Sequence, residues 1–180
     1  MLFHPGQAAL VVIDIQDKLA PTIHGIDGVV RHAGLLMDCA SALGMPILIT
    51  EQYPAGLGPT IPVILDKARS AARIEKTTFS CCRAPAFMQA LETLGRPQII
   101  LAGIETHVCV FQTAADLIEH SYRVQAVSDA VSSRTESNRT IGLERMRHAG
   151  AEVTSFESVI FELLETSNRP EFKQILKLMK

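Results

Sequence analysis

Two stretches of the chain are apolar at almost every position, and this pattern restricts the possible folds more than any other feature. One runs from Ala8 to Ile15 and is interrupted only by Asp14, and the other runs from Ile99 to Ala102. A strand with one solvated face alternates apolar and polar residues, whereas a strand covered on both faces is apolar throughout. Both stretches therefore predict central strands of a parallel sheet with helices on its two faces.

Strands and helices are expected to alternate along the whole chain, which contains no Pro- or Ser-rich linker and no internal repeat. The further strands are predicted at 46–50, 72–75, 123–128 and 151–155, and the main helices at 29–43, 85–94, 107–121, 133–148, 156–164 and from Pro170 onward. This order predicts one α/β domain over residues 1–180, a Rossmann-like three-layer sandwich with a six-stranded parallel sheet. The strands at 8–15 and 98–103 are expected side by side at the switch point, where ligands bind.

Charge and hydropathy argue against several classes of protein. The formal net charge is -2, and the few Lys and Arg clusters contain no interleaved aromatic residues, so nucleic acid is not expected as a partner. No apolar run is long enough to cross a bilayer, so no membrane association is expected. Residues 1–7 lack the basic and apolar regions of a signal peptide, which predicts a cytoplasmic location. The chain lacks GxGxxG and GxxxxGKS/T motifs, and no cofactor is expected.

Cys109 is the candidate nucleophile among four cysteines, which stand at positions 39, 81, 82 and 109 without a CxxC pair. Reduced thiols are expected, with Cys39 in the core. Cys109 falls in the first turn of a predicted helix, where unpaired N–H groups and the helix dipole favour a thiolate. The alternative is a small buried core residue. Cys81 and Cys82 are expected to be inert, with oxidation or pairing with Cys109 as the alternative.

Asp14, Lys76 and Cys109 each stand at the carboxyl end of a predicted strand. In one parallel sheet these ends share an edge, so the three side chains are expected to converge. Singly, each has an ordinary explanation: an acid capping a loop, a solvated lysine or a core thiol. Together they suit acyl transfer to water, in which Asp14 takes the thiol proton, Lys76 stabilises the thiolate and Cys109 attacks an acyl carbon. The oxyanion would lie against backbone N–H groups at the helix start.

Three segments resemble the signature blocks of the isochorismatase-like cysteine hydrolase superfamily. They are Val11–Gln16, Glu75–Ser80 and Gly103–Val110, and the later pieces Gln112–Ala114 and Ser128–Ala130 are similar to that pattern as well. Within the superfamily, Glu51–Thr60 and Leu143–Arg147 resemble the isochorismatase domain-containing subgroup that also occurs in animals. The resemblance covers nearly the whole chain.

The resemblance implies a six-stranded parallel sheet and a catalytic triad of Asp14, Lys76 and Cys109 that works through a thioester intermediate. It also implies a non-proline cis peptide bond before Glu105. The backbone N–H groups of Glu105 and Cys109 would then form the oxyanion hole. These residue roles are expectations that come from the resemblance.

The segment after the second strand departs from one branch of the superfamily. Metal-binding nicotinamidases carry an Asp-x-His pair there, whereas this chain has Glu51-Gln52-Tyr53. One acid without a neighbouring histidine is a poor zinc site. No metal is therefore expected, and Glu51 remains available to orient the substrate.

Six residues near the predicted edge are candidates for substrate binding: Gln16, Glu51, Tyr53, Leu57, Phe79 and His107. Residues 53–62 contain three prolines and two glycines, which predicts a loop that belongs either to the binding site or to a plain surface connection. Tyr53, Leu57 and Phe79 are expected either to wall the pocket or to pack. His107 either bonds the substrate or caps the helix, and the cap is favoured.

The predicted activity is metal-independent hydrolysis of a small-molecule amide or ester. The alternatives are a vinyl-ether hydrolase, as the isochorismatases of this superfamily are, a metal-dependent amidase, and a non-catalytic binding protein that keeps the fold. A homo-oligomer, either a dimer or a tetramer, is expected because members of the superfamily commonly assemble. The C-terminal helix also carries an apolar stripe that one domain is not expected to cover fully, at Phe172, Ile175, Leu176 and Met179.

Overall fold

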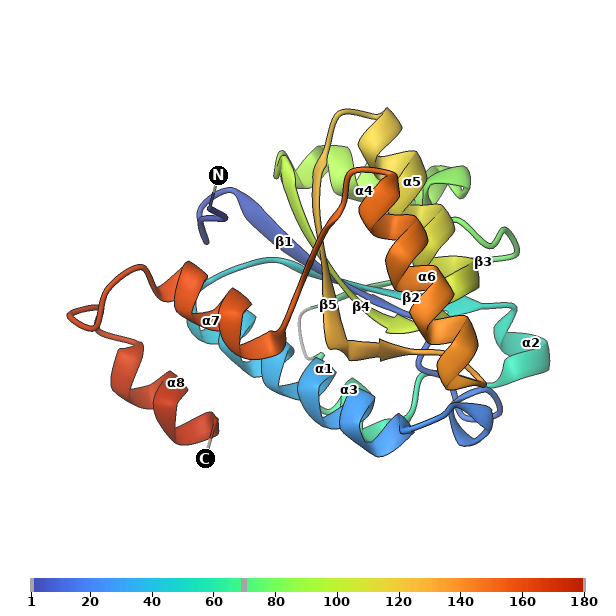
Figure 1. Cartoon of the computed structure of the whole chain (residues 1–180), viewed down its shortest axis with the longest axis horizontal. Coiled ribbons are helices and arrows are strands. Elements are labelled where there is room, and N and C mark those ends of the chain that lie inside the picture. Colours follow the sequence, from blue (N-terminus) through green and yellow to red (C-terminus); the bar gives the residue numbers. More distant parts are fainter. Residues whose placement is uncertain (1, 69–70, 180) are drawn as a thin grey trace.

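Six parallel strands form one sheet in the computed structural model, which describes residues 2–68 and 71–179. They are β1 (Ala8–Ile13), β2 (Ile47–Gln52), β3 (Ala72–Lys76), β4 (Gln98–Ile104), β5 (Arg123–Ser132) and β6 (Glu152–Thr154). The order across the sheet is β3-β2-β1-β4-β5-β6, with β1 and β4 side by side at the centre (Figure 1). The predicted α/β sandwich with a parallel sheet is confirmed, and so is its central pair of strands.

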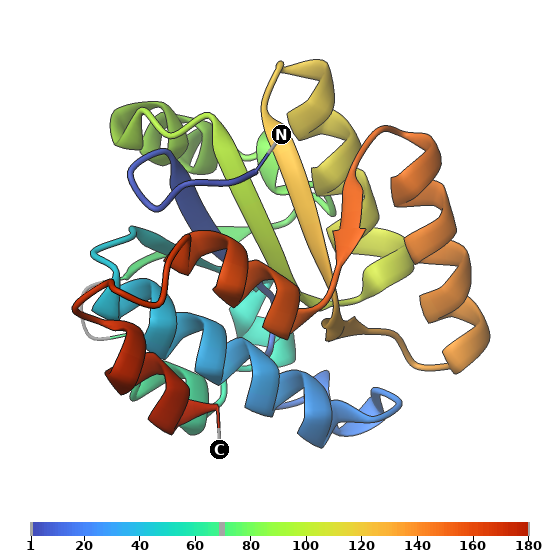
Figure 2. The ribbon, with the colours of Figure 1, turned by 60° about the vertical axis from the view of Figure 1, so that its left-hand side comes forward.

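Helices cover both faces of the sheet (Figure 2). One face carries α1 (Ile26–Ala42), α3 (Pro62–Leu65), α7 (Phe156–Leu164) and α8 (Phe172–Leu178), and the other carries α4 (Pro85–Leu94), α5 (Phe111–Glu119) and α6 (Glu136–His148). Short elements are η1 (Ala20–Thr22), α2 (Pro54–Leu57), η2 (Cys81–Arg83) and the π-helical turn η3 (Thr106–Val110). Within the described residues, no helix has the length and apolar character needed to span a bilayer.

The side chains of β1 alternate between two apolar clusters. Leu10 and Val12 pack with residues of α1 and α7, whereas Val11 and Ile13 pack with residues of α4 and α5. Every residue of β1 and of β4 is buried. Burial on both faces explains why these strands are apolar throughout, and it gives the loops at the carboxyl edge a fixed platform.

Gly103 brings β4 against β1 just before the sheet ends. It pairs in register with Ile13. Its φ is +120°, and a Cβ at this position would lie 2.1 Å from the Ile13 carbonyl oxygen. Any side chain would therefore push the two strands apart. This close approach sets the spacing between Asp14, which follows β1, and the turn that follows β4.

Three local expectations are wrong. The segment 53–62 contains the one-turn helix α2, in which the Tyr53 ring lies over Gly56, where a Cβ would meet the ring at 2.3 Å. The helix that carries the candidate nucleophile begins with a π-helical turn rather than an α-helical one. Helix α6, predicted from residue 133, begins at Glu136 and is capped by the hydroxyl of Thr135.

The apolar stripe of the C-terminal helix is only partly covered within the chain. Ile175 is fully buried, whereas Phe172, Leu176 and Met179 are partly buried. Figure 2 shows α8 lying along α1. The incomplete cover agrees with the expectation that one domain does not bury the stripe fully.

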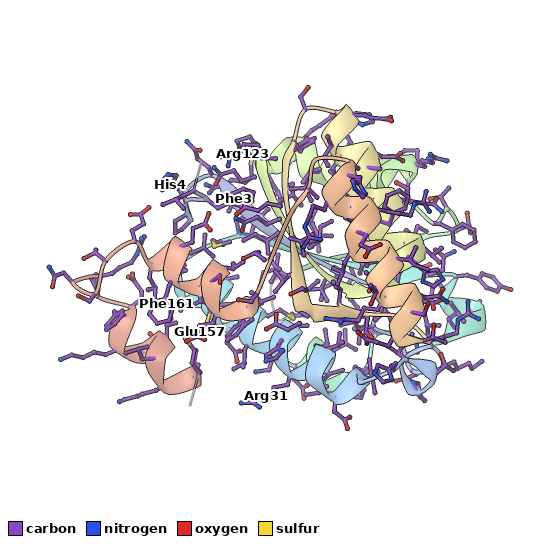
Figure 3. The ribbon with its side chains drawn as sticks, viewed as in Figure 1. Phe3, His4, Arg31, Arg123, Glu157 and Phe161 are labelled. Carbon is purple, nitrogen blue, oxygen red and sulfur yellow. The ribbon has the colours of Figure 1, made fainter. Side chains whose placement is uncertain are left out.

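The amino-terminal edge of the sheet is closed by the first residues of the chain. Phe3 is buried, and the guanidinium of Arg123 lies over its ring at 4.9 Å from the centroid (Figure 3). The backbone N–H of His4 donates to the side-chain oxygen of Gln98 at 2.8 Å. Packing and hydrogen bonds thus occupy this edge, and the predicted functional side chains lie at the opposite one.

Candidate active site

Asp14, Lys76 and Cys109 meet at the carboxyl edge of the sheet. Asp14 follows β1 with a φ of 53°, Lys76 is the last residue of β3, and Cys109 lies in η3 after β4. The Lys76 ammonium lies 2.7 Å from Oδ2 of Asp14, and neither side chain is exposed. The charges of Asp14 and Lys76 both shift the pKa of the Cys109 thiol, so the three groups lie close together. The predicted convergence is therefore found in the structure.

Both carboxylate oxygens of Asp14 have a donor. Lys76 donates to Oδ2, and the hydroxyl of Thr50 donates to Oδ1 at 2.7 Å. The backbone N–H of Asp14 donates to the Thr50 carbonyl at 3.1 Å. A buried carboxylate is stable only when it is paired in this way. β2 therefore fixes the orientation of the acid from one side, and β3 supplies its counter-ion.

The Lys76 ammonium is held by several oxygen atoms. It donates to Oε1 of Gln52 at 2.7 Å and to the carbonyls of Thr78 and Phe79 at 3.2 and 3.3 Å. Burial by itself lowers the pKa of Lys76, but the Asp14 charge outweighs this effect and raises the pKa above its ordinary value. Lys76 is therefore a permanent cation at neutral pH.

The Cys109 thiol is a weaker acid than a free cysteine. Burial raises its pKa most, the Asp14 charge raises it further, and the Lys76 charge lowers it only in part. The expectation of a favoured thiolate is wrong for the unliganded site, because the thiol is buried and the Lys76 charge is compensated by Asp14. The thiol therefore needs a base to become a nucleophile.

The turn before Cys109 begins with a cis peptide bond between Ile104 and Glu105. The Glu105 carbonyl then accepts the N–H groups of Val108 and Val110, both at 3.1 Å. Among the described residues, the Cys109 N–H makes no bond to this carbonyl. The N–H of Cys109 therefore takes no part in the hydrogen bonds to the Glu105 carbonyl.

Helix α6 supports this turn through a glycine. A Cβ on Gly142 would lie 2.8 Å from the carbonyl carbon and oxygen of Thr106 and from the backbone nitrogen of His107. The helix and the turn therefore touch backbone to backbone. No larger residue fits at this position without moving η3.

Gln16 and Glu51, predicted as substrate-binding candidates, bond to the chain itself. The amide of Gln16 donates to the carbonyls of Gln52 and Gly58 at 3.0 and 2.7 Å and accepts the N–H of Gln52 at 2.8 Å. Oε1 of Glu51 accepts both the N–H and the hydroxyl of Thr60, at 2.8 and 2.7 Å. These two buried side chains hold the segment 53–62 against the sheet.

The apolar candidates lie at the rim. Tyr53 and Phe79 are 57% and 55% exposed, and Leu57 is half-buried. Tyr53 and Lys76 line a cavity of about 360 Å³ together with Pro54 and Pro85.

His107 does not cap the helix, contrary to the favoured expectation. Its Nδ1 lies 2.9 Å from the hydroxyl of Ser133, and Glu105 occupies the capping position of η3. His107 is therefore fixed to the segment that leaves β5. Ser133 therefore bonds to the turn that holds Cys109 and does not cap helix α6.

Sequence reasoning missed Thr50 and Gln52, which hold Asp14 and Lys76. Thr50 ends the strand predicted at 46–50, so the argument that strand ends share one edge applies to it as well. β2 extends two residues beyond the predicted end, and Gln52 is the second of them. In the described residues, no group of three or more His, Cys, Asp or Glu side chains is arranged to hold a metal ion.

Curated relatives match almost the whole chain. The model of the isochorismatase domain matches residues 8–158. Isochorismatase domain-containing protein 2A of Mus musculus is 39% identical over 98% of this chain and 84% of its own length. The secreted isochorismatase effector Isc1 of Phytophthora sojae is also 39% identical, over 98% of this chain and 86% of its own.

Solved structures agree with the fold. MAR1 ribonuclease from Caenorhabditis elegans has a TM-score of 0.95 and 38% identity, covering 99% of this chain and 92% of that one. YcaC from Pseudomonas aeruginosa, solved with covalent acrylamide, has a TM-score of 0.92 and 25% identity, covering 98% of this chain and 91% of that one. The Escherichia coli YcaC product, an octameric hydrolase of unknown specificity, has a TM-score of 0.94 and 26% identity. The match covers 99% of this chain and 89% of that one. Sequence and fold together place this chain in the isochorismatase family, with a hydrolase fold of that family.

Proposed function

We propose that this protein hydrolyses a small-molecule amide or ester through a thioester on Cys109, with Asp14 and Lys76 completing a catalytic triad. The observation that carries the proposal is the position of the Asp14 carboxylate between Lys76 and Cys109. Its carboxylate is paired with Lys76, and its charge acts on the nearby Cys109 thiol. A charged base beside a neutral thiol is the arrangement that general-base activation needs.

The first half-reaction transfers the acyl group to the enzyme. Asp14 accepts the thiol proton as the Cys109 sulfur attacks the acyl carbon. The carbonyl oxygen becomes an oxyanion, which the N–H groups of Glu105 and Cys109 stabilise. As the tetrahedral intermediate collapses, the bond to the leaving group breaks, and Asp14 gives its proton to the departing amine or alkoxide. Lys76 keeps Asp14 ionised before attack.

The second half-reaction returns the enzyme to its starting state. Asp14 takes a proton from a water molecule, which attacks the thioester carbon. The carbon–sulfur bond breaks, the acid product leaves, and the Cys109 sulfur recovers a proton from Asp14. No group beyond the triad, the backbone N–H groups and water is needed. A metal-independent reaction is therefore proposed, supported by the bonds that commit Glu51 to Thr60.

A screen of small amides and esters against the parent protein, Cys109→Ala and Asp14→Asn tests the proposal. The parent is expected to turn over at least one compound, with activity unchanged after chelation. Both variants are expected to lose about a thousandfold or more in kcat. Turnover of a vinyl ether by Cys109→Ala would favour the isochorismatase-type reaction instead. A parent that binds small molecules without turning any over would favour a non-catalytic binding protein.

Cleavage of RNA is a second candidate function. Its support is the 38% identity and the 0.95 TM-score with MAR1 ribonuclease from Caenorhabditis elegans. The formal net charge of -2 weighs against it, because RNA binding depends on basic surface. Incubation of a labelled single-stranded RNA with the parent and Cys109→Ala separates the two candidates. Cleavage that requires Cys109 would establish the second one.

A homo-oligomer is proposed from the octameric E. coli neighbour. Light scattering after size-exclusion chromatography measures the mass directly. A mass of 19.6 kDa, that of one chain, at micromolar concentration would contradict the proposal.

A cytoplasmic location is likewise a proposal, and the secreted Phytophthora relative provides the contrasting case. Fractionation of the source cells with an antibody against the protein distinguishes the two. Protein found in the medium of intact cells would overturn the cytoplasmic assignment.

A further inference from the structure

Gln52 ends β2 beside the lysine that ends β3. The two residues pair in register, and Oε1 of Gln52 accepts a hydrogen bond from the Lys76 ammonium at 2.7 Å. Among the described residues, Asp14 and Gln52 are the two whose side chains accept from this ammonium. Its other acceptors are two backbone carbonyls, at 3.2 and 3.3 Å. Gln52 therefore supplies the nearest neutral oxygen that fixes the position of the ammonium.

The side-chain amide of Gln16 holds the backbone of Gln52. Its Nε2 donates to the Gln52 carbonyl at 3.0 Å, and its Oε1 accepts the Gln52 N–H at 2.8 Å. The same Nε2 donates to the carbonyl of Gly58 at 2.7 Å. Gln16 is fully buried, so these three bonds fix its orientation and the loss of one leaves a buried polar group unpaired. One amide thus joins Gln52 to the segment 53–62.

These bonds form a continuous path from the rim of the site to the proposed base. The path runs from Gly58 through Gln16, Gln52 and Lys76 to Asp14, and its hydrogen bonds are between 2.7 and 3.0 Å long. Coupling between two places in a protein is carried by contiguous contacts of this kind. A change in the position of the segment 53–62 therefore reaches the ammonium through Gln52.

Glu51 holds the same segment by a separate route. Its Oε1 accepts the N–H and the hydroxyl of Thr60 at 2.8 and 2.7 Å, and its side chain is buried like that of Gln16. In the described part of the chain, the Glu51 side chain makes no hydrogen bond to Lys76 or to an acceptor of its ammonium. Two buried side chains thus anchor one segment, and only the Gln16 route leads to the ammonium.

We propose that Gln52 is a positioning residue of the reaction, through which the position of the segment 53–62 sets that of the Lys76 ammonium. This inference rests on the proposed function, because it assigns Gln52 a part in the same triad. The ammonium keeps Asp14 charged, and the attraction between the two charges depends on their separation. A ligand that moves the segment therefore alters this charge pair. Gln52 itself touches no reacting atom.

NMR of the lysine ammonium groups tests the path without any turnover. In protein with isotopically labelled lysine, the Lys76 signal is identified by its absence from Lys76→Met. Gln52→Met and Gln16→Met are both expected to shift this signal, because each breaks the path. Glu51→Met is the matched control, since it releases the same segment from its other anchor, and it is expected to leave the signal in place.

An unmoved Lys76 signal in Gln16→Met, or an equal shift in Glu51→Met, would overturn the inference. If Gln16→Met does not fold, Gln16→Asn takes its place with the same expected shift, because the shorter amide does not reach both partners. The NMR result holds even if Cys109 forms no acyl intermediate. Failure of this inference is therefore distinguished from failure of the proposed chemistry.

Kinetics on a compound found by the screen give the second measurement. Gln52→Met is expected to lower kcat about tenfold or more, as for loss of a hydrogen bond to a charged group, with KM changed by about twofold or less. Because Gln16 acts through Gln52, adding Gln16→Met is expected to lower kcat little further, whereas adding Glu51→Met should multiply the two single effects. Full multiplication for the Gln16 and Gln52 variants, or an effect of Gln52→Met on KM alone, would overturn the inference.

Discussion

The ammonium of Lys76 lies 2.7 Å from Oδ2 of Asp14, with both side chains fully withdrawn from solvent. Two charges at this depth are stable only together, because removal of one leaves the other buried without a counter-ion. The pair joins β3 to β1 across β2 and keeps the carboxylate charged beside Cys109. One contact therefore serves both the stability of the carboxyl edge and the proposed chemistry.

Lys76→Met is expected to lower the free energy of unfolding by about 3–5 kcal/mol, since it strands the Asp14 charge in the core. Asp14→Asn combined with Lys76→Met should recover a large part of this loss. Urea unfolding of the single and double variants measures the coupling. Lys67→Met is the control, because Lys67 pairs with Asp38 where both side chains are partly exposed, and its loss should cost about 1 kcal/mol or less. Equal costs for the two lysines would refute the account of the buried pair.

The pH profile of Cys109 alkylation should show a raised pKa. Burial and the Asp14 charge raise the pKa of this thiol, so iodoacetamide should label it slowly near pH 7 and faster only in alkaline solution. Asp14→Asn removes a negative charge and should move the profile toward lower pH, although the variant is inactive. Peptide mass spectrometry across the pH range gives the profile, with Glu51→Gln as a control for loss of a buried acid. A parent profile with its midpoint below neutrality would show a resting thiolate instead.

Stability should decrease as the pH rises above about 9, the ordinary pKa of cysteine. Burial raises the pKa of Cys39 to about 12 and that of Cys81 to about 11. The folded state then holds protons that the unfolded state has released, so each thiol contributes a slope of about 1.4 kcal/mol per pH unit above the unfolded pKa. Denaturant unfolding at several alkaline pH values measures it. Replacing both residues by alanine should reduce the slope by about half, because burial raises the pKa of Cys82 and of Cys109 as well. An unchanged slope would contradict this explanation.

Gly142→Ala is expected to lower activity more than a substitution elsewhere that causes the same loss of stability. The added methyl group would meet the backbone of Thr106 and His107 at 2.8 Å, and the turn that holds Cys109 must shift. A stability loss of about 1–3 kcal/mol is expected from overpacking. Gly28→Ala in α1 is the control, because a Cβ there meets nothing within 4 Å, and it should stabilise by up to about 1 kcal/mol. Full activity of Gly142→Ala would show that the turn tolerates displacement.

The convergence of Asp14, Lys76 and Cys109 could be predicted because these residues obey a local rule. Asp14 directly follows β1, Lys76 ends β3 and Cys109 lies in the turn after β4. Parallel strands end at one edge, so no knowledge of side-chain packing was needed. The same rule applies to Thr50, which ends the predicted second strand. The continuous apolar runs of β1 and β4 likewise predicted the centre of the sheet from pattern alone.

The remaining features depend on contacts between distant parts of the chain. Arg134 is held in position by its bond to Glu105, and a glycine is needed at position 142 because α6 approaches η3 closely there. Neither contact leaves a periodic signal in the sequence. The raised pKa of Cys109 also depends on depth of burial and on the compensation of Lys76 by Asp14. A position near a helix start predicts the opposite shift, because it ignores desolvation.

The most direct test of the central claim is intact-mass and peptide mass spectrometry of the protein, quenched in acid during hydrolysis of an activated ester such as p-nitrophenyl acetate. The account predicts an acyl group on Cys109 that forms within the first turnover and disappears as substrate is exhausted. It should be absent from Cys109→Ser, while Asp14→Asn should form and lose it slowly. Steady turnover with no adduct, or by Cys109→Ala at the parent rate, would contradict the account.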